Sequence, residues 1–355
     1  MSSFKRLVHS LPPTPNNPRN SEGAFIRAKN GDILFAYSRY CGISDHDNAT
    51  CDIALLRSSD EGENWVFDKI IAYTKDFNAQ NLMSVSALIQ GDTSLAFYFL
   101  IKENDKTGTV GRIVSKDGVN FSPEDAERCD FCAKKGYYVI NNDRISRLSD
   151  GKIIFPAAYY PTYECSVPAK ATLLISNDDG KTIEDSGFYL ESSYTVNSRT
   201  GLQEPGAIET DDGIYMWFRT RYGCQYESKC EGLSLEFSTP LPSVFTSPCS
   251  PMQIKRFDGV YYAVYNPIPN YDGRIFYKGT AGRSPIVIRK SIDCVNWGEL
   301  TVLEGNDERR GYCYPAIFKT NDNCLLLAYC RGDEFLDGDI LDNTGIIKLK
   351  IDSIQ

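Results

Sequence analysis

The sequence predicts an all-β fold, specifically a six-bladed β-propeller built of four-stranded antiparallel blades. Three observations predict it: a turn motif that repeats along the chain, apolar runs of strand length beside those turns, and the lack of sustained helical periodicity. The 22 tyrosines and 18 phenylalanines also favour strands. Glycine and proline are scattered instead of gathered in a linker. We therefore expect one domain over residues 1–355, with residues 1–18 as an N-terminal arm.

The repeated motif has the form S-x-D-x-G-x-x-W and is complete at residues 58–65. A second copy covers residues 176–183, with isoleucine in the aromatic place. Shorter copies start at Ser115 and Ser291, and a worn copy starts at Ser228. In the complete copy, the aspartate can bond its own backbone two residues on, and glycine accepts positive φ, so the motif indicates a hairpin turn. The copies start about 58 residues apart, a period that suits a four-stranded blade and gives about six blades.

Apolar strands that follow a turn give a second signal of the same kind. Each begins with Asn, Asp or Gly and continues into four or more apolar residues, as a hairpin strand does. The clearest examples are residues 30–37, 150–156, 211–217 and 322–329.

Charge and composition exclude several classes of function. The net charge of −9 and the absence of a basic stripe argue against a nucleic-acid partner. No run approaches the roughly 18 apolar residues of a membrane span, and the N-terminus lacks the apolar core of a signal peptide. We therefore expect no membrane partner, a cytoplasmic location and reduced cysteines. The single CxxC, at Cys129 and Cys132, and only two histidines argue against a zinc site.

One segment near the middle of the chain carries the most specific functional signal. Gln203-Glu204-Pro205 places a carboxylate ahead of one strand, and Arg219 closes the next strand. With the repeated turns, this segment resembles the sialidase superfamily, whose blades carry such "Asp boxes" and whose Asn-Glu-Pro-Gln motif supplies a glutamate that pairs with the nucleophile. The resemblance covers nearly the whole chain. It implies that Glu204 is this glutamate and that Arg219, with Arg221 as an alternative, is one of three arginines that bind a carboxylate.

The resemblance also implies the other arginines. Sialidases open with an arginine before their first apolar strand, usually followed by Ile-Pro; Arg19 occupies this place, although Ile-Pro is missing and Glu22 follows. Arg27 is a weaker substitute. Arg283 lies ahead of an Asp box, where the third arginine of the family lies, and Arg39 closes the strand after Arg19.

An acid and a nucleophile complete the expected site. The family has an aspartate about six residues after the arginine that closes this strand, which implies Asp45 as the acid/base, with Asp47 as the alternative. Tyr314 is the expected nucleophile, and Tyr312 is either the alternative or a ring wall. If residues 312–314 are extended, both rings lie on one face of the strand.

These residues suit the hydrolysis of an acidic sugar. Arginines give a carboxylate bidentate, charge-assisted hydrogen bonds. A neutral tyrosine nucleophile avoids the repulsion that a carboxylate nucleophile would meet beside the sugar's own carboxylate. We therefore expect an exo-acting sialidase-type glycoside hydrolase that acts with retention, without metal or cofactor, on an acidic sugar or a sialylated oligosaccharide. The alternatives are a non-catalytic Asp-box propeller that binds glycan or protein, and a five-bladed glycosidase with two carboxylates, which the repeat count and the arginines disfavour.

Overall fold

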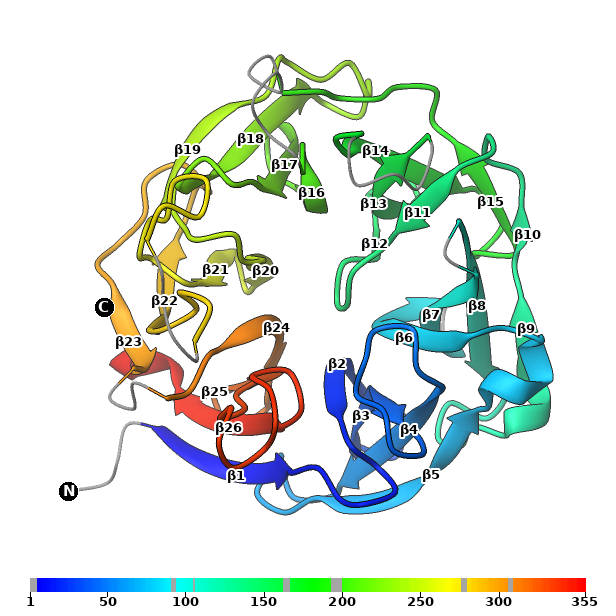
Figure 1. Cartoon of the computed structure of the whole chain (residues 1–355). Coiled ribbons are helices and arrows are strands. Elements are labelled where there is room, and N and C mark those ends of the chain that lie inside the picture. The colour runs from blue at the N-terminus through cyan, green and yellow to red at the C-terminus, as the bar shows by residue number, and fades with distance from the viewer. Residues whose placement is uncertain are drawn as a thin grey trace.

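Six β-sheets stand in a ring around a central axis in the computed structural model (Figure 1). The model describes residues 5–90, 94–104, 106–161, 167–192, 200–275, 280–305 and 309–355. Within these ranges there is no α-helix, and the helical elements are the short 3-10 helices η1 (Thr74–Phe77), η2 (Pro123–Asp125) and η4 (Ile351–Ser353). The predicted six-bladed propeller is confirmed.

The first three blades follow one another along the chain, each running from the axis outward. Blade 3 departs from the simple pattern because its inner strand is split in two, β11 and β12, and because β10 adds to its outer edge in parallel. The strands are β2 (Asn20–Arg27), β3 (Ile33–Tyr40), β4 (Cys51–Ser58) and β5 (Val66–Ala72) in blade 1; β6 (Asn81–Gln90), β7 (Ser94–Asn104), β8 (Thr107–Ser115) and β9 (Ala126–Arg128) in blade 2; and β10 (Asp130–Phe131), β11 (Tyr137–Val139), β12 (Ser146–Arg147), β13 (Ile153–Tyr160), β14 (Lys170–Ser176) and β15 (Thr182–Asp185) in blade 3.

The last blade closes the ring with both ends of the chain. Its outer strand β1 comes from the N-terminus and pairs antiparallel with β26, so Lys5–Leu11 is part of a blade and not of a free arm. This pairing leaves no strand edge open where the ring closes. The strands are β16 (Gln203–Glu209), β17 (Gly213–Arg219), β18 (Cys224–Glu231) and β19 (Leu241–Thr246) in blade 4; β20 (Gln253–Phe257), β21 (Val260–Tyr265), β22 (Ile286–Ser291) and β23 (Thr301–Glu304) in blade 5; and β24 (Cys313–Lys319), β25 (Cys324–Cys330), β26 (Thr344–Lys350) and β1 (Lys5–Leu11) in blade 6.

The hydrophobic core is divided among the six interfaces between neighbouring blades. Each interface holds its own cluster of buried residues. Successive side chains of a strand point to opposite faces, so one strand supplies two interfaces. On β17, Met216 packs toward blade 3 and Trp217 toward blade 5. This double burial explains why the second strands of the blades read as continuous apolar runs.

The Asp-box turns join the third and fourth strands of four blades. In each, the serine hydroxyl donates to the aspartate carboxylate, at 2.8 Å for Ser58 and Asp60 and at 2.9 Å for Ser291 and Asp293. The pairs from Ser115 and Ser176 repeat this bond. The worn copy differs, because Ser228 donates instead to the carbonyl of Ser238 at 2.6 Å. Blade 4 therefore lacks the aspartate turn.

Two further findings bear on the class of protein. Among the described residues no helix has the length and apolarity needed to cross a membrane. The eleven cysteines in these ranges are all free thiols.

Candidate active site

The expected catalytic residues and two of the arginines lie at one end of the ring, because of where each stands on its strand. Glu204 and Tyr314 stand at the start of inner strands, Arg219 ends a second strand, and Arg283 precedes a third strand. In an antiparallel blade these positions share one end. The Asp-box turns follow the third strands, so they lie at the opposite end.

Bulges near the axis direct the key side chains. The inner strands β2, β6, β16 and β24 each carry a register shift at a residue with positive φ: Glu22 (41°), Ser84 (59°), Glu204 (46°) and Tyr314 (55°). Positive φ costs a non-glycine residue roughly 1–2 kcal/mol, and such strain concentrates at functional sites. Each bulge redirects the side chain of its residue. The four residues therefore occupy equivalent positions in their blades.

The centre of the site is a contact between Tyr314 and Glu204, which are 110 residues apart. The Tyr314 hydroxyl donates to Glu204 Oε1 at 2.9 Å, and Arg219 donates to the same oxygen at 2.6 Å. The Arg283 guanidinium lies 5.8 Å from the centre of the Tyr314 ring. Asn142, near the axis, donates to the Tyr314 carbonyl at 3.2 Å and fixes the strained backbone there.

The electrostatics of this cluster make Glu204 an acceptor. Burial alone would raise the pKa of Glu204, but the charge and hydrogen bond of Arg219, followed by Arg283, hold that pKa below its usual range. Burial, followed by the charge of Glu204, raises the pKa of Tyr314 well above its usual value, and the two arginines oppose this effect. Tyr314 is therefore a neutral phenol beside an ionised carboxylate.

Two adjoining cavities open at this end of the ring. The larger, about 560 Å³, is lined by Glu22, Asp47, Glu204 and Tyr314 among others. The smaller, about 460 Å³, is lined by Arg219, Arg283 and Cys249, and the two cavities share Arg221. The smaller cavity thus carries a dense positive charge next to the Tyr314–Glu204 pair.

Arg19 is buried close to this site but does not stand among the residues that line either cavity. Its Nη1 donates to the Asp47 carboxylate at 2.6 Å, and its Nη2 lies 3.8 Å from Glu22 Oε1. Its guanidinium also stacks 4.5 Å above the centre of the Tyr40 ring. The structure therefore brings Arg219 and Arg283 together and keeps Arg19 behind the carboxylate of Glu22.

The two loop aspartates differ in position. Both are exposed to solvent, but Asp45 offers its backbone carbonyl to Arg19 at 3.2 Å, whereas the Asp47 side chain, 63% exposed, lines the larger cavity. Burial would raise the pKa of Asp47, but the charge and hydrogen bond of Arg19 lower it. Arg39 lies beside Cys41, at 3.9 Å from its sulfur, and is not a lining residue of either cavity.

Arg27 and Tyr312 have structural partners elsewhere. Arg27 forms an ion pair with Glu61, in the Asp-box turn at the far end of the blade. Tyr312 is 1% exposed and packs edge-on against Tyr329 in the core between blades 5 and 6. The expectation that Tyr312 and Tyr314 share a strand face is wrong, because the bulge at Tyr314 breaks the alternation of an extended strand.

Sequence reasoning missed the role of Glu22. In the sequence Glu22 is notable only as a departure from the family pattern after Arg19, whereas the structure places it in blade 1 at the position of Glu204 in blade 4 and Tyr314 in blade 6. The sequence carries no motif that marks such a bulge. The one sequence feature that Glu22, Glu204 and Tyr314 share is that the next residue is a glycine or a proline (Gly23, Pro205, Pro315).

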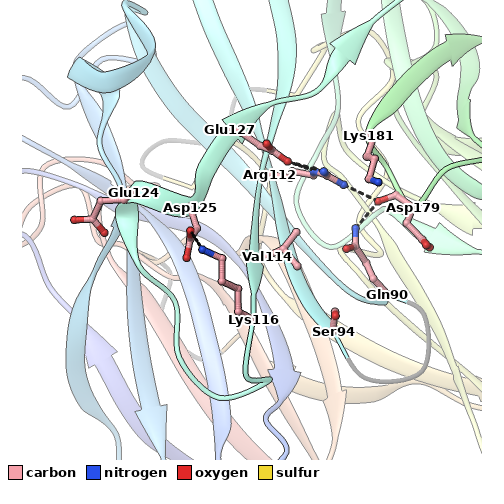
Figure 2. A pocket seen from close by; sticks show the side chains of 10 residues that line it. All are labelled: Gln90, Ser94, Arg112, Val114, Lys116, Glu124, Asp125, Glu127, Asp179 and Lys181. Carbon is pink, nitrogen blue, oxygen red and sulfur yellow. Dashed lines mark hydrogen bonds and ion pairs between the residues drawn. The ribbon is translucent and has the colours of Figure 1, made fainter.

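Another hollow lies between blades 2 and 3, on the side of the Asp-box turns (Figure 2). Four of its charged side chains form two ion pairs. Arg112 donates to Glu127 and to the carbonyl of Asp179, and Lys116 pairs with Asp125. The bond from Arg112 to the Asp179 carbonyl ties blade 2 to blade 3, and the cluster around Glu204 is left as the candidate active site. In the described ranges, no group of three or more His, Cys, Asp or Glu side chains is arranged to hold a metal ion.

Comparison with known proteins bears on the fold and the family. The family model of the BNR repeat-like domain matches residues 52–327. The chain belongs to this family. Among curated proteins no match was found.

Solved structures of similar fold include several sialidases. The Hadza microbial sialidase Hz136 superposes with a TM-score of 0.71 at 13% identity; the match covers 95% of this chain and 66% of that one, so the chain spans slightly less than two thirds of Hz136. The K499G mutant of the NanB sialidase from Streptococcus pneumoniae gives 0.70 at 12% identity, covering 100% and 72%. A Dyadobacter fermentans protein of unknown function gives 0.66 at 16%, covering 98% and 99%. At such identities the likeness shows the fold alone.

Proposed function

We propose that this BNR-repeat propeller is an exo-acting glycoside hydrolase of the sialidase type. It removes a terminal α-linked sialic acid, or a related acidic keto-sugar, with retention of configuration. The observation that carries the proposal is the hydrogen bond from Tyr314 to Glu204, with Arg219 on the same carboxylate oxygen and Arg283 beside the ring. A phenol, its proton acceptor and two cations then stand together beside a cavity large enough for a sugar.

The arginine pair supplies the substrate specificity in this proposal. Arg219 and Arg283 line the same cavity and both lie within a buried site, where charge-assisted hydrogen bonds to a carboxylate are strong. Arg221 lines that cavity as well. A neutral sugar would offer no anion to Arg283 and would leave Arg219 with Glu204 alone. The substrate class is therefore a sugar that carries a carboxylate.

The proposed reaction has two displacement steps. Tyr314 Oη attacks the anomeric carbon, Glu204 takes the phenolic proton, and an acid protonates the oxygen of the departing group. Water then attacks the same carbon, its proton goes to the conjugate base of that acid, and Glu204 returns its proton to the Tyr314 oxygen. Arg219 and Arg283 favour the phenolate that forms in the second step. No oxidant or external group is consumed.

The acid is expected to be one of the two aspartates on the loop after β3. Sequence spacing points to Asp45, whereas position at the cavity favours Asp47, although its ion pair with Arg19 lowers the pKa of Asp47 and so disfavours the protonated form that a general acid needs. Replacing the true acid by asparagine is expected to lower kcat/KM by about 10²–10⁴-fold for a substrate with a poor leaving group, and much less for an aryl sialoside. Comparing Asp45→Asn and Asp47→Asn on both substrates identifies it. Equal losses on the two substrates in both variants would contradict an acid on this loop.

Hydrolysis of a fluorogenic α-sialoside tests the function itself, run beside the corresponding Kdn and Kdo substrates. Turnover of at least one of the three, absent from a Glu204→Ala variant, is the expected result. Binding of the free sugar without turnover would instead favour a non-catalytic glycan-binding propeller. A cytoplasmic location, with small sialylated oligosaccharides as substrates, stays a prediction from the sequence.

A further inference from the structure

Glu22 is a buried carboxylate that the proposed reaction does not use. It is 3% exposed, lines the same cavity as Tyr314 and Glu204, and stands at the equivalent bulge of its own blade. The Ser84 hydroxyl, from the bulge of the next blade, donates to Glu22 Oε2 at 2.6 Å. Its other oxygen, Oε1, faces Nη2 of Arg19 at 3.8 Å. A strained, nearly inaccessible carboxylate in a cavity wall calls for a functional explanation.

Arg19 has unused hydrogen-bonding capacity behind this carboxylate. Asp47 and the Asp45 carbonyl engage its Nη1, while Nη2 has only the 3.4 Å contact to Ser21 and the longer one to Glu22. Its buried Nε has no hydrogen-bond partner. Burying a guanidinium that is 3% exposed and keeps a free donor costs folding free energy unless another anion accepts a hydrogen bond from it.

Other charged or titratable groups surround this pair on every side. Burial raises the pKa of Glu22 to about 7, and Arg19 and the Ser84 hydrogen bond oppose the rise. The remaining groups that act electrostatically on Glu22 or Arg19 are Asp47 and Asp342 from loops, Tyr40 and Cys51 of blade 1, and Tyr314 and Cys330 of blade 6. Glu22 is the member of the pair that also lines the cavity.

We propose that Glu22 is a specificity-determining residue that holds Arg19 as an internal ion pair, so that a ligand carboxylate gains Arg19 only when Glu22 carries a proton. This inference rests on the proposed function, because it names a sialic acid carboxylate as the anion. Ionised Glu22 attracts Arg19 across the 3.8 Å from Oε1 to Nη2 and repels the incoming carboxylate. Protonated Glu22 removes the negative charge and leaves Nη2 and Nε for the ligand.

The consequence is that binding takes up one proton. The carboxyl of Glu22 is protonated below about pH 7 in the free protein. Above that pH the fraction of protein in which Glu22 is protonated falls about tenfold per pH unit, so the apparent Kd is expected to rise about tenfold per pH unit. The same linkage predicts that a Glu22→Gln variant, which is neutral at every pH, binds equally well at pH 6 and pH 8.

Calorimetric titration with free N-acetylneuraminic acid, in two buffers of different ionisation enthalpy, measures this proton directly. At pH 8 the wild-type protein is expected to take up close to one proton per ligand, and Glu22→Gln close to none. His46 is an imidazole that lines the same cavity, so His46→Gln is the matched control and is expected to keep the uptake. Ser84→Ala gives a second, milder variant. The hydrogen bond from Ser84 stabilises the ionised form of Glu22, so its loss is expected to raise the pKa of Glu22. Proton uptake by Ser84→Ala is then expected to persist, with its midpoint at higher pH.

Three outcomes overturn the inference in distinguishable ways. Uptake that survives in Glu22→Gln assigns the proton to another group. Wild-type affinity that does not change between pH 7 and pH 9 shows that Arg19 is not gated. Absence of binding in both proteins at every pH between 5 and 9 rejects the sialic acid site itself, and the inference with it.

Discussion

Replacing Tyr314 by phenylalanine is expected to lower kcat for sialoside hydrolysis about 10³-fold or more while leaving the protein folded. The change keeps the ring and removes the oxygen that donates to Glu204 at 2.9 Å. Glu204 Oε1 still accepts from Arg219, so no buried carboxylate loses its counter-ion. The loss therefore reports the missing nucleophile and not a collapsed site. Steady-state kinetics and a thermal melt of the same preparation check both halves of this expectation.

Tyr312→Phe is the matched control for that variant. Tyr312 lies two residues earlier, but its ring is in the core against Tyr329. Its loss of one hydroxyl is expected to leave kcat within a few-fold of wild type. Full activity in both variants would rule out a tyrosine nucleophile. Collapse in Tyr312→Phe alone would show that the bulge does not place Tyr314 at the reacting carbon.

Replacing Arg219 by alanine is expected to weaken binding of a carboxylate-bearing sugar by about 2–5 kcal/mol, the cost of losing one partner of a desolvated charge pair. Arg219 is buried, pairs with Glu204 at 2.6 Å and lines the cavity with Arg283. The affinity for the matched neutral sugar, in which the carboxylate is reduced to an alcohol, is expected to change much less. Calorimetry with both ligands separates the two.

The Arg219→Ala substitution also removes the main cation that pairs with Glu204. Arg219 is the largest influence that lowers the pKa of Glu204 against its burial, so this pKa is expected to rise in Arg219→Ala. The acid limb of the pH–rate profile, which reflects ionised Glu204, then moves to higher pH. Arg219→Lys restores the charge without the bidentate geometry. It is expected to restore the pH of the acid limb more fully than the affinity for the carboxylate-bearing sugar. Equal loss of both ligands, with an unmoved limb, would mean that Arg219 acts only on structure.

The sequence predicted the parts of this site that follow from period and strand order. The repeated Ser58-type turns predict the blades, and strand order then places Glu204, Arg219 and Tyr314 at one end of the ring. These features depend on local turn chemistry and on alternation along a strand, both of which are visible in single segments.

What the sequence could not predict comes from the bulges and from contacts between blades. Alternation assigned Tyr312 to the face of Tyr314, but a single residue at positive φ reversed it. Glu22 became a wall of the cavity for the same reason, and Arg19 lost its direct access because Asp47, from a loop 28 residues away, pairs with it. Such register shifts and loop contacts are settled by tertiary packing, which leaves no periodic trace in the sequence.

The most direct test of the central claim is to trap the covalent intermediate. A 2,3-difluoro sialic acid slows both steps, and its fluoride leaves readily, so the sugar is expected to remain attached to the nucleophile. Peptide mass spectrometry of the wild-type protein is expected to find one added sugar on the peptide that contains Tyr314, and none in Tyr314→Phe. A label on a carboxylate residue, or turnover of sialosides with no label on Tyr314, would contradict the tyrosine–glutamate mechanism.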